Sequence, residues 1–479
     1  MNSSTKYYVY LGLTIAAYFV ASKFVFDKVY DTIRIVIDEL FHIPQGLAFC
    51  KHNFTYWDPK ITTLPGLYLV SSVFLGNYFK CNTYNLRFTN LIASVVNLIL
   101  FASIFKFTYG NNQPSKNVLQ ALSLAILPPL YFFSHVYYTD TLSLTFLLIF
   151  SRLCFTSKFK ISILIFGLWS VLMRQTNIVW VAMVFGHKTL DMLIRTSRVF
   201  GNTYLTKMTS RRTSIIDKDI DNTKLKRYYG LADVYVALKY HLSTCFVTFF
   251  KYLTIQDWLV LLTHGIILIT FVTFVFLNGS IVLGDKKAHE ATIHIPQMFY
   301  FLIFYGIFGL PYVIIKFTTT FKLIFGNKLK IIILTLIFLA IVHFNTVSHP
   351  YLLADNRHYT FYVWNRWYGK YYFAKYVSVP VYVFLLINLY ANLKDQNCVS
   401  FLLPYTICVF IVLSLQKMIE IRYFLIPYII LRLRFAKPSV WVVFGEFLWY
   451  IILNAATFYL FFTKEIIWKD FDYTQRLIW

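Results

Sequence analysis

Charged residues are scarce for a chain of this length. Only 14% of the 479 residues are Asp, Glu, Lys or Arg, whereas 58% are hydrophobic. A soluble protein of this size would need far more polar surface. The composition therefore excludes the soluble classes and indicates a polytopic membrane protein. Because apolar stretches recur from end to end, we expect residues 1–479 to form a single integral-membrane domain.

Motifs for nucleotide binding and for cysteine-based sites are missing as well. There is no P-loop, no Gly-rich dinucleotide fingerprint and no GxSxG motif, which argues against nucleotide-driven chemistry. The six cysteines show no CxxC spacing, so the sequence indicates neither a zinc site nor a disulfide framework. We expect no metal ion and no other cofactor.

Positive charge, in contrast, is in excess, with a formal net charge of +24. In a multispan protein such an excess usually lies in cytoplasmic loops, and we expect no nucleic-acid partner. Residues 187–251 contain twelve Lys and Arg against five Asp, whereas residues 27–63 contain four against five acidic residues. By the positive-inside tendency, 187–251 is a basic cytoplasmic loop. The first loop (27–65) then faces the opposite side, together with 278–297 and 348–366.

The apolar runs predict an all-α bundle with about 11 to 14 membrane crossings. We interpret the first run as a retained signal anchor, because no small-residue cleavage site follows it. The run 66–79 is short enough to lie in the membrane interface. The run 161–186 contains Arg174, which is costly in hydrocarbon, so a hairpin broken at 174–177 is one possibility. The runs are 8–26, 66–79, 88–108, 118–133, 140–156, 161–186, 258–277, 298–315, 331–347, 376–393, 400–416, 423–431 and 438–462.

A dense polar stretch, DELFHIPQ at 38–45, follows the first apolar run. In a helix, Asp38 and His42 would share one face, and Glu39 would point about 100° away. Two adjacent carboxylates at a membrane surface can divide roles, one as a base and the other orienting a hydroxyl. The alternative is a set of ordinary polar residues on an interfacial helix.

The same loop carries side chains that suit a sugar. Pro44 cannot continue helical hydrogen bonding, so a break there would aim Gln45 separately. Trp57 offers a flat indole and Asp58 a carboxylate, which fit the C–H faces and hydroxyls of a sugar ring. The alternative is an Asp-Pro turn beside an interfacial tryptophan.

Residues 349–367 form a third polar cluster. Arg357 and Arg366 could clamp a phosphate through their planar guanidinium groups, and His358 could assist as a donor. The alternative is a basic and aromatic interfacial belt.

Other ionisable residues are less informative. The histidines and glutamate within 289–294 match no helical zinc motif, which favours a structural or substrate-contact role over metal binding. Glu420 and Arg422 can neutralise each other within an apolar context, whereas Arg174 has no partner nearby in the sequence.

Six blocks of the sequence together resemble one family, the endoplasmic-reticulum dolichyl-phosphate-glucose-dependent alpha-1,2-glucosyltransferases of lipid-linked oligosaccharide assembly. They run in family order across nearly the whole chain. The blocks are DELFHIPQ (38–45), WDPKITTLPGLYL (57–69), RQTNIVW (174–180), GDKKAHEATIHIPQ (284–297), HPYLLADNRHYTFYVWNR (349–366) and EIRYFLIPY (420–428). The long basic segment 187–251 departs from the pattern.

The resemblance implies a GT-C type helical bundle in the endoplasmic-reticulum membrane, with lumenal loops that form the active site. It implies dolichyl-phosphate-glucose as the donor and a diglucosylated, dolichyl-pyrophosphate-linked oligosaccharide as the acceptor, joined with inversion at the anomeric carbon. The implied site has three groups of residues: Asp38 and Glu39 in catalysis, His42, Gln45, Trp57 and Asp58 around the acceptor sugar, and Arg174, Arg357, His358 and Arg366 at the donor phosphate. Whether Asp38 or Glu39 is the base stays open, with Asp38 preferred.

Two other classes of protein remain as alternatives. A multispan transporter or channel could use Arg174, Glu420 and Arg422 as residues of an intramembrane path. A non-catalytic assembly factor would not require Asp38. The polar clusters gather in the outer loops rather than through the spans, which favours an interfacial enzyme.

Overall fold

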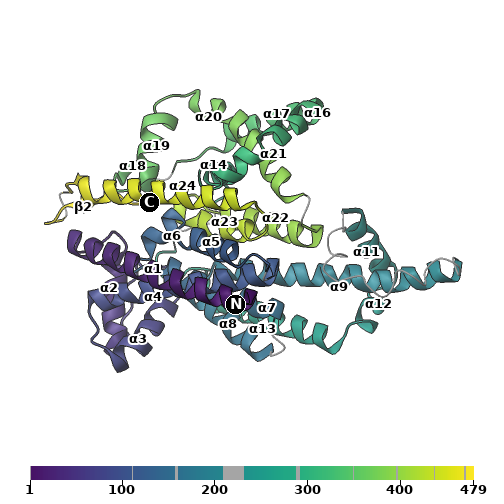
Figure 1. Ribbon diagram of the computed structural model, residues 1–479, viewed down its shortest axis with the longest axis horizontal. Helices are drawn as coiled ribbons and strands as arrows, with labels where there is room; N and C mark the ends of the chain where they lie inside the picture. The colour runs from purple at the N-terminus through teal and green to yellow at the C-terminus, as the bar shows by residue number, and fades with distance from the viewer. Residues whose placement is uncertain are drawn as a thin grey trace.

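A computed structural model of the protein describes residues 2–110, 112–156, 160–208, 231–286, 292–348, 350–394, 397–435, 437–468 and 471–479. These residues are almost entirely helical (Figure 1). The one sheet among them has two short antiparallel strands, β1 (Glu465–Ile466) and β2 (Gln475–Arg476). The all-α fold class predicted from the composition is confirmed.

The helices of the first half of the chain are α1 (Ser3–Thr32), α2 (Glu39–Cys50), α3 (Gly66–Tyr78), α4 (Thr83–Tyr109), α5 (Pro114–Ala125), α6 (Pro128–Phe133), α7 (Thr139–Thr156), α8 (Lys160–Met173), α9 (Asn177–Met208), α11 (Leu231–Ser243) and α12 (Val247–Lys251). Those of the second half are α13 (Ile255–Asn278), α14 (Pro296–Phe308), α15 (Leu310–Ile315), α16 (Phe317–Gly326), α17 (Lys328–Asn345), α18 (Pro350–Ala354), α19 (Tyr359–Val363), η2 (Trp364–Tyr368), α20 (Ala374–Val377), α21 (Val379–Leu393), α22 (Val399–Ser414), η3 (Ile421–Phe424), α23 (Leu425–Arg432) and α24 (Val440–Thr463).

Seven stretches of the described chain are long and apolar enough to cross a membrane: α1, α4, α7, α13, α17, the α20–α21 segment and α24. Three shorter apolar helices, α8, α14 and α22, accompany them. A helix satisfies its own backbone hydrogen bonds, which is what a chain in hydrocarbon requires. The protein is therefore a multi-pass membrane protein. The figure of 11 to 14 crossings stays a prediction.

Several predicted runs are divided in the structure. The break predicted at 174–177 is confirmed, because α8 ends at Met173 and α9 begins at Asn177. Segment 187–251 is more helical than the predicted loop: residues 187–208 continue α9, and α11 and α12 follow. Its most basic part lies within 209–230, outside the described residues, so its cytoplasmic placement stays a prediction.

The two halves of the chain pack on each other. In Figure 1 the green and yellow C-terminal helices lie above the purple and teal N-terminal ones. Helix α22 packs on α9, and α24 packs on α5. A fully buried, bidentate ion pair between Arg432 of α23 and Glu446 of α24 holds the C-terminal helices together. Loops from both halves consequently meet at one end of the bundle.

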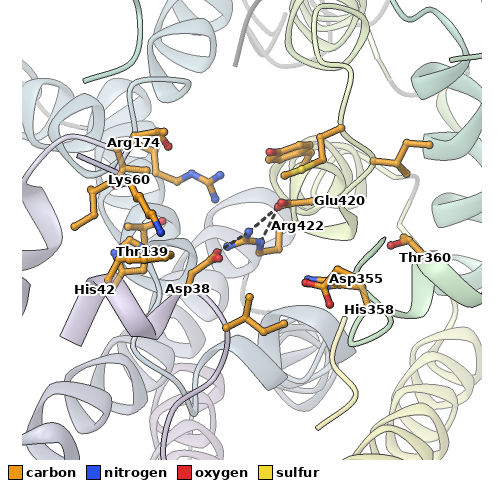
Figure 2. Close-up of a pocket in the computed structure, with 18 of the residues that line it drawn as sticks. Asp38, His42, Lys60, Thr139, Arg174, Asp355, His358, Thr360, Glu420 and Arg422 are labelled. Atoms are coloured by element: carbon orange, nitrogen blue, oxygen red, sulfur yellow. Dashed lines mark hydrogen bonds and ion pairs between the residues drawn. The ribbon is translucent and has the colours of Figure 1, made fainter. Parts of the chain in front are cut away.

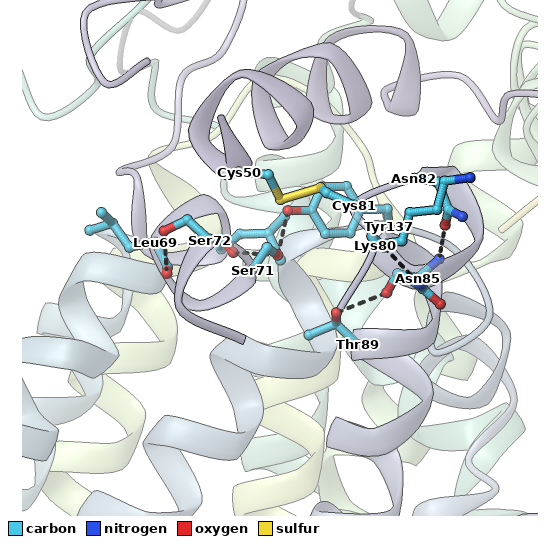
Figure 3. The surroundings of a disulfide bond; sticks show 11 residues. Cys50, Leu69, Ser71, Ser72, Lys80, Cys81, Asn82, Asn85, Thr89 and Tyr137 are labelled. Atoms are coloured by element: carbon cyan, nitrogen blue, oxygen red, sulfur yellow. Dashed lines mark hydrogen bonds between the residues drawn. A yellow bond between two sulfur atoms is a disulfide. The ribbon is translucent and has the colours of Figure 1, made fainter. Parts of the chain in front are cut away.

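A disulfide joins Cys50, at the end of α2, to Cys81, just before α4 (Figure 3). The prediction that the cysteines form no disulfide framework is therefore wrong for this pair. Its members are 31 residues apart without a diagnostic spacing, and only the packing of α3 against α2 brings them together. A side chain at Gly76 of α3 would lie 2.9 Å from the carbonyl oxygen of Cys50, so glycine permits this close packing.

Candidate active site

A polar cavity of about 250 Å³ lies where the helix ends of both halves meet. It is walled by the start of α2, the loop at 60–63, the start of α7, the α8–α9 turn and the segments 352–360 and 418–423. The polar side chains around it include those labelled in Figure 2: Asp38, His42, Lys60, Thr139, Arg174, Asp355, His358, Thr360, Glu420 and Arg422. The cavity thus joins five of the six blocks identified in the sequence, all except 284–297.

Asp38 occupies the N-cap position of α2, directly before the first helical residue. Its backbone N–H donates to the hydroxyl of Tyr138, 3.0 Å away, which fixes the start of the helix. Its side chain is 35% exposed and points into the cavity toward Arg422 (Figure 2). A carboxylate at this place is stabilised by the positive end of the helix dipole and still reaches a ligand.

The environment keeps the Asp38 carboxyl charged. Burial is the largest single influence and would raise its pKa. The charge of Arg422, 3.0 Å away, the hydrogen bond from Arg422 and the smaller effects of His42 and His358 together hold the pKa below its ordinary value. Asp38 is therefore an ionised carboxylate at neutral pH, the form that can accept a proton.

Arg422 is the centre of a larger network of charges. Besides Asp38, it pairs with Glu420 at 2.7 Å and lies 3.7 Å from Asp140. Asp140, almost fully buried at the start of α7, also pairs with Arg174 from the α8–α9 turn. One buried carboxylate thus positions two guanidinium groups on the wall of the same cavity, and Lys60 adds a third cation.

His42 lies one helical turn after Asp38 and lines the same cavity, as the i, i+4 spacing predicted. Its Nδ1 is 2.6 Å from the hydroxyl of Tyr68. Burial lowers the pKa of His42, so the imidazole is neutral and can exchange hydrogen bonds with a sugar hydroxyl. The predicted helix break is wrong, because Pro44 lies inside α2. Only one backbone hydrogen bond depends on its missing N–H, and the helix continues to Cys50.

Glu39, in contrast, does not line the cavity. Its side chain is fully buried and receives two hydrogen bonds from Arg87, at 2.9 and 2.6 Å. The backbone N–H groups of Val36 and Tyr137 donate to the same carboxylate. With both oxygens occupied, Glu39 holds α2 against α4 and the segment before α7. The structure thus separates the two adjacent carboxylates that the sequence could not tell apart.

The three predicted sugar-binding residues further along the loop also lie off the cavity wall. Gln45 is buried, donates to the carbonyl of Tyr56 and accepts from the backbone N–H of Asp58. Asp58 accepts from the backbone N–H of Lys60, and Trp57 packs against neighbouring aromatic rings. Together they fold the loop that presents Lys60 to the cavity.

The structure divides the four predicted phosphate-binding residues. Arg174 and His358 line the cavity. Arg357 does not line the cavity. Its guanidinium donates two hydrogen bonds to the carboxylate of Asp355, at 2.9 and 2.8 Å, and lies over the ring of Trp468. Arg366 is exposed, with its guanidinium near the ring of Tyr362, and also lies outside the cavity. Arg357 instead holds the C-terminal segment, because its guanidinium donates to Gln475 and its carbonyl accepts from the backbone N–H of Ile478. The carbonyl oxygen of Trp479 lies 3.0 Å from Nδ1 of His358.

Residues that sequence reasoning did not assign to the site are Lys60, Thr139, Asp140, Asp355, Thr360, Glu420 and Arg422. Three of them were visible as charges in an apolar context, because Asp140, Glu420 and Arg422 stand at the edges of apolar runs. The residues within 287–291, including the first histidine and the glutamate of the candidate metal cluster, lie outside the described residues. His294 is buried and receives the backbone N–H of Val347, which agrees with a structural role.

A bundle of apolar helices with a charged cavity among the helix ends defines a membrane-embedded protein that can act on a polar group at the membrane surface. Comparison with known proteins gives the family. The family model described as DIE2/ALG10 family matches residues 32–433, and the chain belongs to this family. No solved structure matches the chain.

Relatives from animals and plants are similar over nearly the whole chain. A protein of Drosophila melanogaster, named Dol-P-Glc:Glc(2)Man(9)GlcNAc(2)-PP-Dol alpha-1,2-glucosyltransferase, is 39% identical over 100% of both chains. A protein of Homo sapiens with the same name is 35% identical over 92% of this chain and 93% of its own. One from Arabidopsis thaliana is 30% identical over 92% and 94%.

Proposed function

We propose that this protein transfers glucose from dolichyl-phosphate-glucose to the diglucosylated, dolichyl-pyrophosphate-linked oligosaccharide, forming an alpha-1,2 bond. Relatives with this named activity are similar over 100% and 92% of the chain. The observation that carries the proposal is one ionised carboxylate, Asp38, facing a cavity that also holds Lys60, Arg174 and Arg422. A carboxylate beside several cations suits a reaction in which a proton is removed and a phosphate group leaves.

The chemistry at the acceptor is a displacement with inversion. The acceptor 2-hydroxyl oxygen bonds to the anomeric carbon of the donor glucose while the bond from that carbon to the phosphate oxygen breaks. Asp38 takes the hydroxyl proton, and dolichyl phosphate leaves with the bonding electrons. Neutral His42, held by Tyr68, orients the acceptor sugar beside Asp38.

The chemistry at the donor is electrostatic. A phosphate leaving group needs little protonation, so fixed cations can stabilise its charge instead. Arg174 and Arg422 are held by Asp140 on the cavity wall, and Lys60 and His358 lie on the same wall. Arg174, Arg422 and Lys60 supply the positive charge that a metal ion would otherwise bring, and we propose that the reaction requires none.

The proposed location is the endoplasmic-reticulum membrane, with the cavity facing the lumen. The near-balanced charge of residues 27–63 supports this orientation, against the basic segment 187–251. The disulfide between Cys50 and Cys81 supports it independently, because disulfides form in oxidising compartments such as this lumen. Segment 27–63 contains Asp38, and Cys50 ends the helix that Asp38 begins.

The test is transfer by the purified protein, reconstituted in lipid, from dolichyl-phosphate-glucose to the diglucosylated acceptor. We expect a product with one additional alpha-1,2-linked glucose, with and without a chelator. A monoglucosylated acceptor serves as the specificity control. Absence of transfer from an abundant, folded protein would overturn the proposed function, and loss of transfer with chelator alone would overturn metal independence.

A further inference from the structure

A second cavity, also of about 250 Å³, lies between α8 and α13, and its lining is almost entirely apolar. Leu168 and Leu172 of α8 form one wall, Phe271 and Phe274 of α13 form another, and Leu64 closes one end. Thr270 is the one lining residue with a polar side chain. Helix α13 is long and apolar enough to cross a membrane, so this cavity opens among the membrane helices.

The cavity has an evident structural origin. At Gly167 an added side chain would lie 2.5 Å from the side chain of Ile267, so α8 and α13 are in close contact there. Ile267 also lines the cavity, and the other lining residues of the two helices, within 168–172 on α8 and 270–274 on α13, come after this contact. The helices therefore touch at Gly167 and leave a space beyond it, on the side where α8 ends.

That side is where the polar cavity begins. Leu64 lines the apolar cavity, and its neighbour Thr63 lines the polar one. Leu172 lines the apolar cavity, and two residues later Arg174 lines the polar one. The side chain of Gln175 donates to the carbonyl of Thr62, at 2.8 Å, and this hydrogen bond joins the α8–α9 turn to the loop at 60–63. The same two chain segments, 63–64 and 172–174, thus contribute to both cavities, and the second of them ends at Arg174.

We propose that the apolar cavity binds the first isoprene units of the donor lipid, so that its phosphate meets Arg174. This inference rests on the proposed function. In the donor, one phosphate alone separates the hydrocarbon chain from the reacting sugar. In the acceptor, the reacting glucose stands at the far end of an oligosaccharide, so the acceptor chain has no need to lie beside the site. An apolar cavity next to a phosphate-binding cation therefore fits the donor chain.

The first experiment fills the cavity. Thr270→Trp and, separately, Leu168→Trp should raise the apparent KM for dolichyl-phosphate-glucose at least fivefold and leave the acceptor KM unchanged. The matched control is Val272→Trp, on the same helix but 65% exposed and outside the cavity lining, which should behave like the wild type. An unchanged donor KM in both folded variants, or a selective rise in the acceptor KM, would overturn the proposal.

The second experiment uses the wild-type protein, so its result does not depend on whether a variant folds. A dolichyl-phosphate-glucose analogue with a photoreactive diazirine on its first isoprene unit should label peptides of α8 or α13 in the wild-type protein. Unlabelled donor should compete for this labelling. Labelling confined to other helices would overturn the proposed location. A protein that is labelled but transfers no glucose would instead overturn the proposed function and leave the lipid site standing.

Discussion

The guanidinium of Arg422 lies 3.0 Å from the carboxylate of Asp38, although the two residues are 384 positions apart in the chain. This ion pair joins the first loop to the segment before α23, and it sets both the charge and the direction of the proposed base. The neighbouring carboxylate, Glu39, does not line the cavity and is fully buried against Arg87.

Replacing Asp38 with Asn should lower the transfer rate by about 100- to 10,000-fold, the usual contribution of a general base. The amide keeps the shape of the side chain but cannot take the acceptor proton. The measurement is kcat with purified protein at saturating donor and acceptor. Asp58→Asn is the matched control, because Asp58 lies in the same loop outside the cavity and should retain its activity. Near-normal kcat in the Asp38 variant would contradict its role as base.

Replacing Arg422 with Gln should move the acid limb of the pH–activity profile to higher pH. In the wild type, burial favours a raised pKa for Asp38, but Arg422, with smaller contributions from His42 and His358, holds that pKa low, so the base stays ionised as the pH falls. Without that positive charge, burial raises the pKa, and Asp38 becomes protonated at a higher pH. The measurement is kcat/KM against pH, with Arg366→Gln as an exposed control outside the cavity. A lower rate with an unmoved acid limb would show that Arg422 does not set the charge of Asp38.

Replacing Glu39 with Gln should cost stability rather than catalysis alone. The change leaves Arg87 buried without its counter-charge, which typically costs about 3–5 kcal/mol. Two measurements check this: the thermal unfolding midpoint of the purified protein and its size-exclusion profile. Glu446→Gln breaks the equally buried pair with Arg432, far along the chain, and should produce a similar loss. A Glu39→Gln protein that is as stable as the wild type but transfers no glucose would show that Glu39 acts in catalysis.

Replacing Arg174 with Ala should weaken donor use more strongly than the same change at Arg366. Arg174 lines the cavity and is oriented by Asp140, whereas Arg366 is exposed outside it. The expected result is a raised donor KM, a lowered kcat or both for Arg174→Ala, and wild-type kinetics for Arg366→Ala. Equal losses in the two variants would indicate a donor path that includes the exposed arginine.

Removing the disulfide with Cys50→Ser should destabilise the protein by about 2–4 kcal/mol, the usual contribution of a disulfide. Helix α2 would then lose its covalent link near α4, and activity should fall because Asp38 begins that helix. The measurement is thermal unfolding and transfer activity, with and without reductant. Cys245→Ser, a change at an exposed free cysteine, is the control. Wild-type behaviour of Cys50→Ser, together with full resistance to reductant, would contradict the stabilising role.

The local pattern of the sequence predicted much of the site. The polar block 38–45 after an apolar run gave the place of the proposed base, and i, i+4 spacing put His42 on the same face. The charge in 161–186 indicated the break at which Arg174 lies. Local pattern failed where a contact depends on distant chain segments. It could not show that the guanidinium of Arg357 is bound by Asp355, nor that Cys50 forms a disulfide with Cys81.

Composition and periodicity by themselves determined that this is a helical membrane protein with polar loops, because hydrocarbon accepts only apolar, internally hydrogen-bonded segments. The resemblance of the sequence blocks to one family then implied that the base is Asp38 or Glu39. The tertiary structure alone decided between the directions of Asp38 and Glu39 and selected Arg174, Arg422 and Lys60 as the cations around the cavity. The physical reason is that the role of a charge depends on its partner and its burial, and both are set by residues far away in the chain.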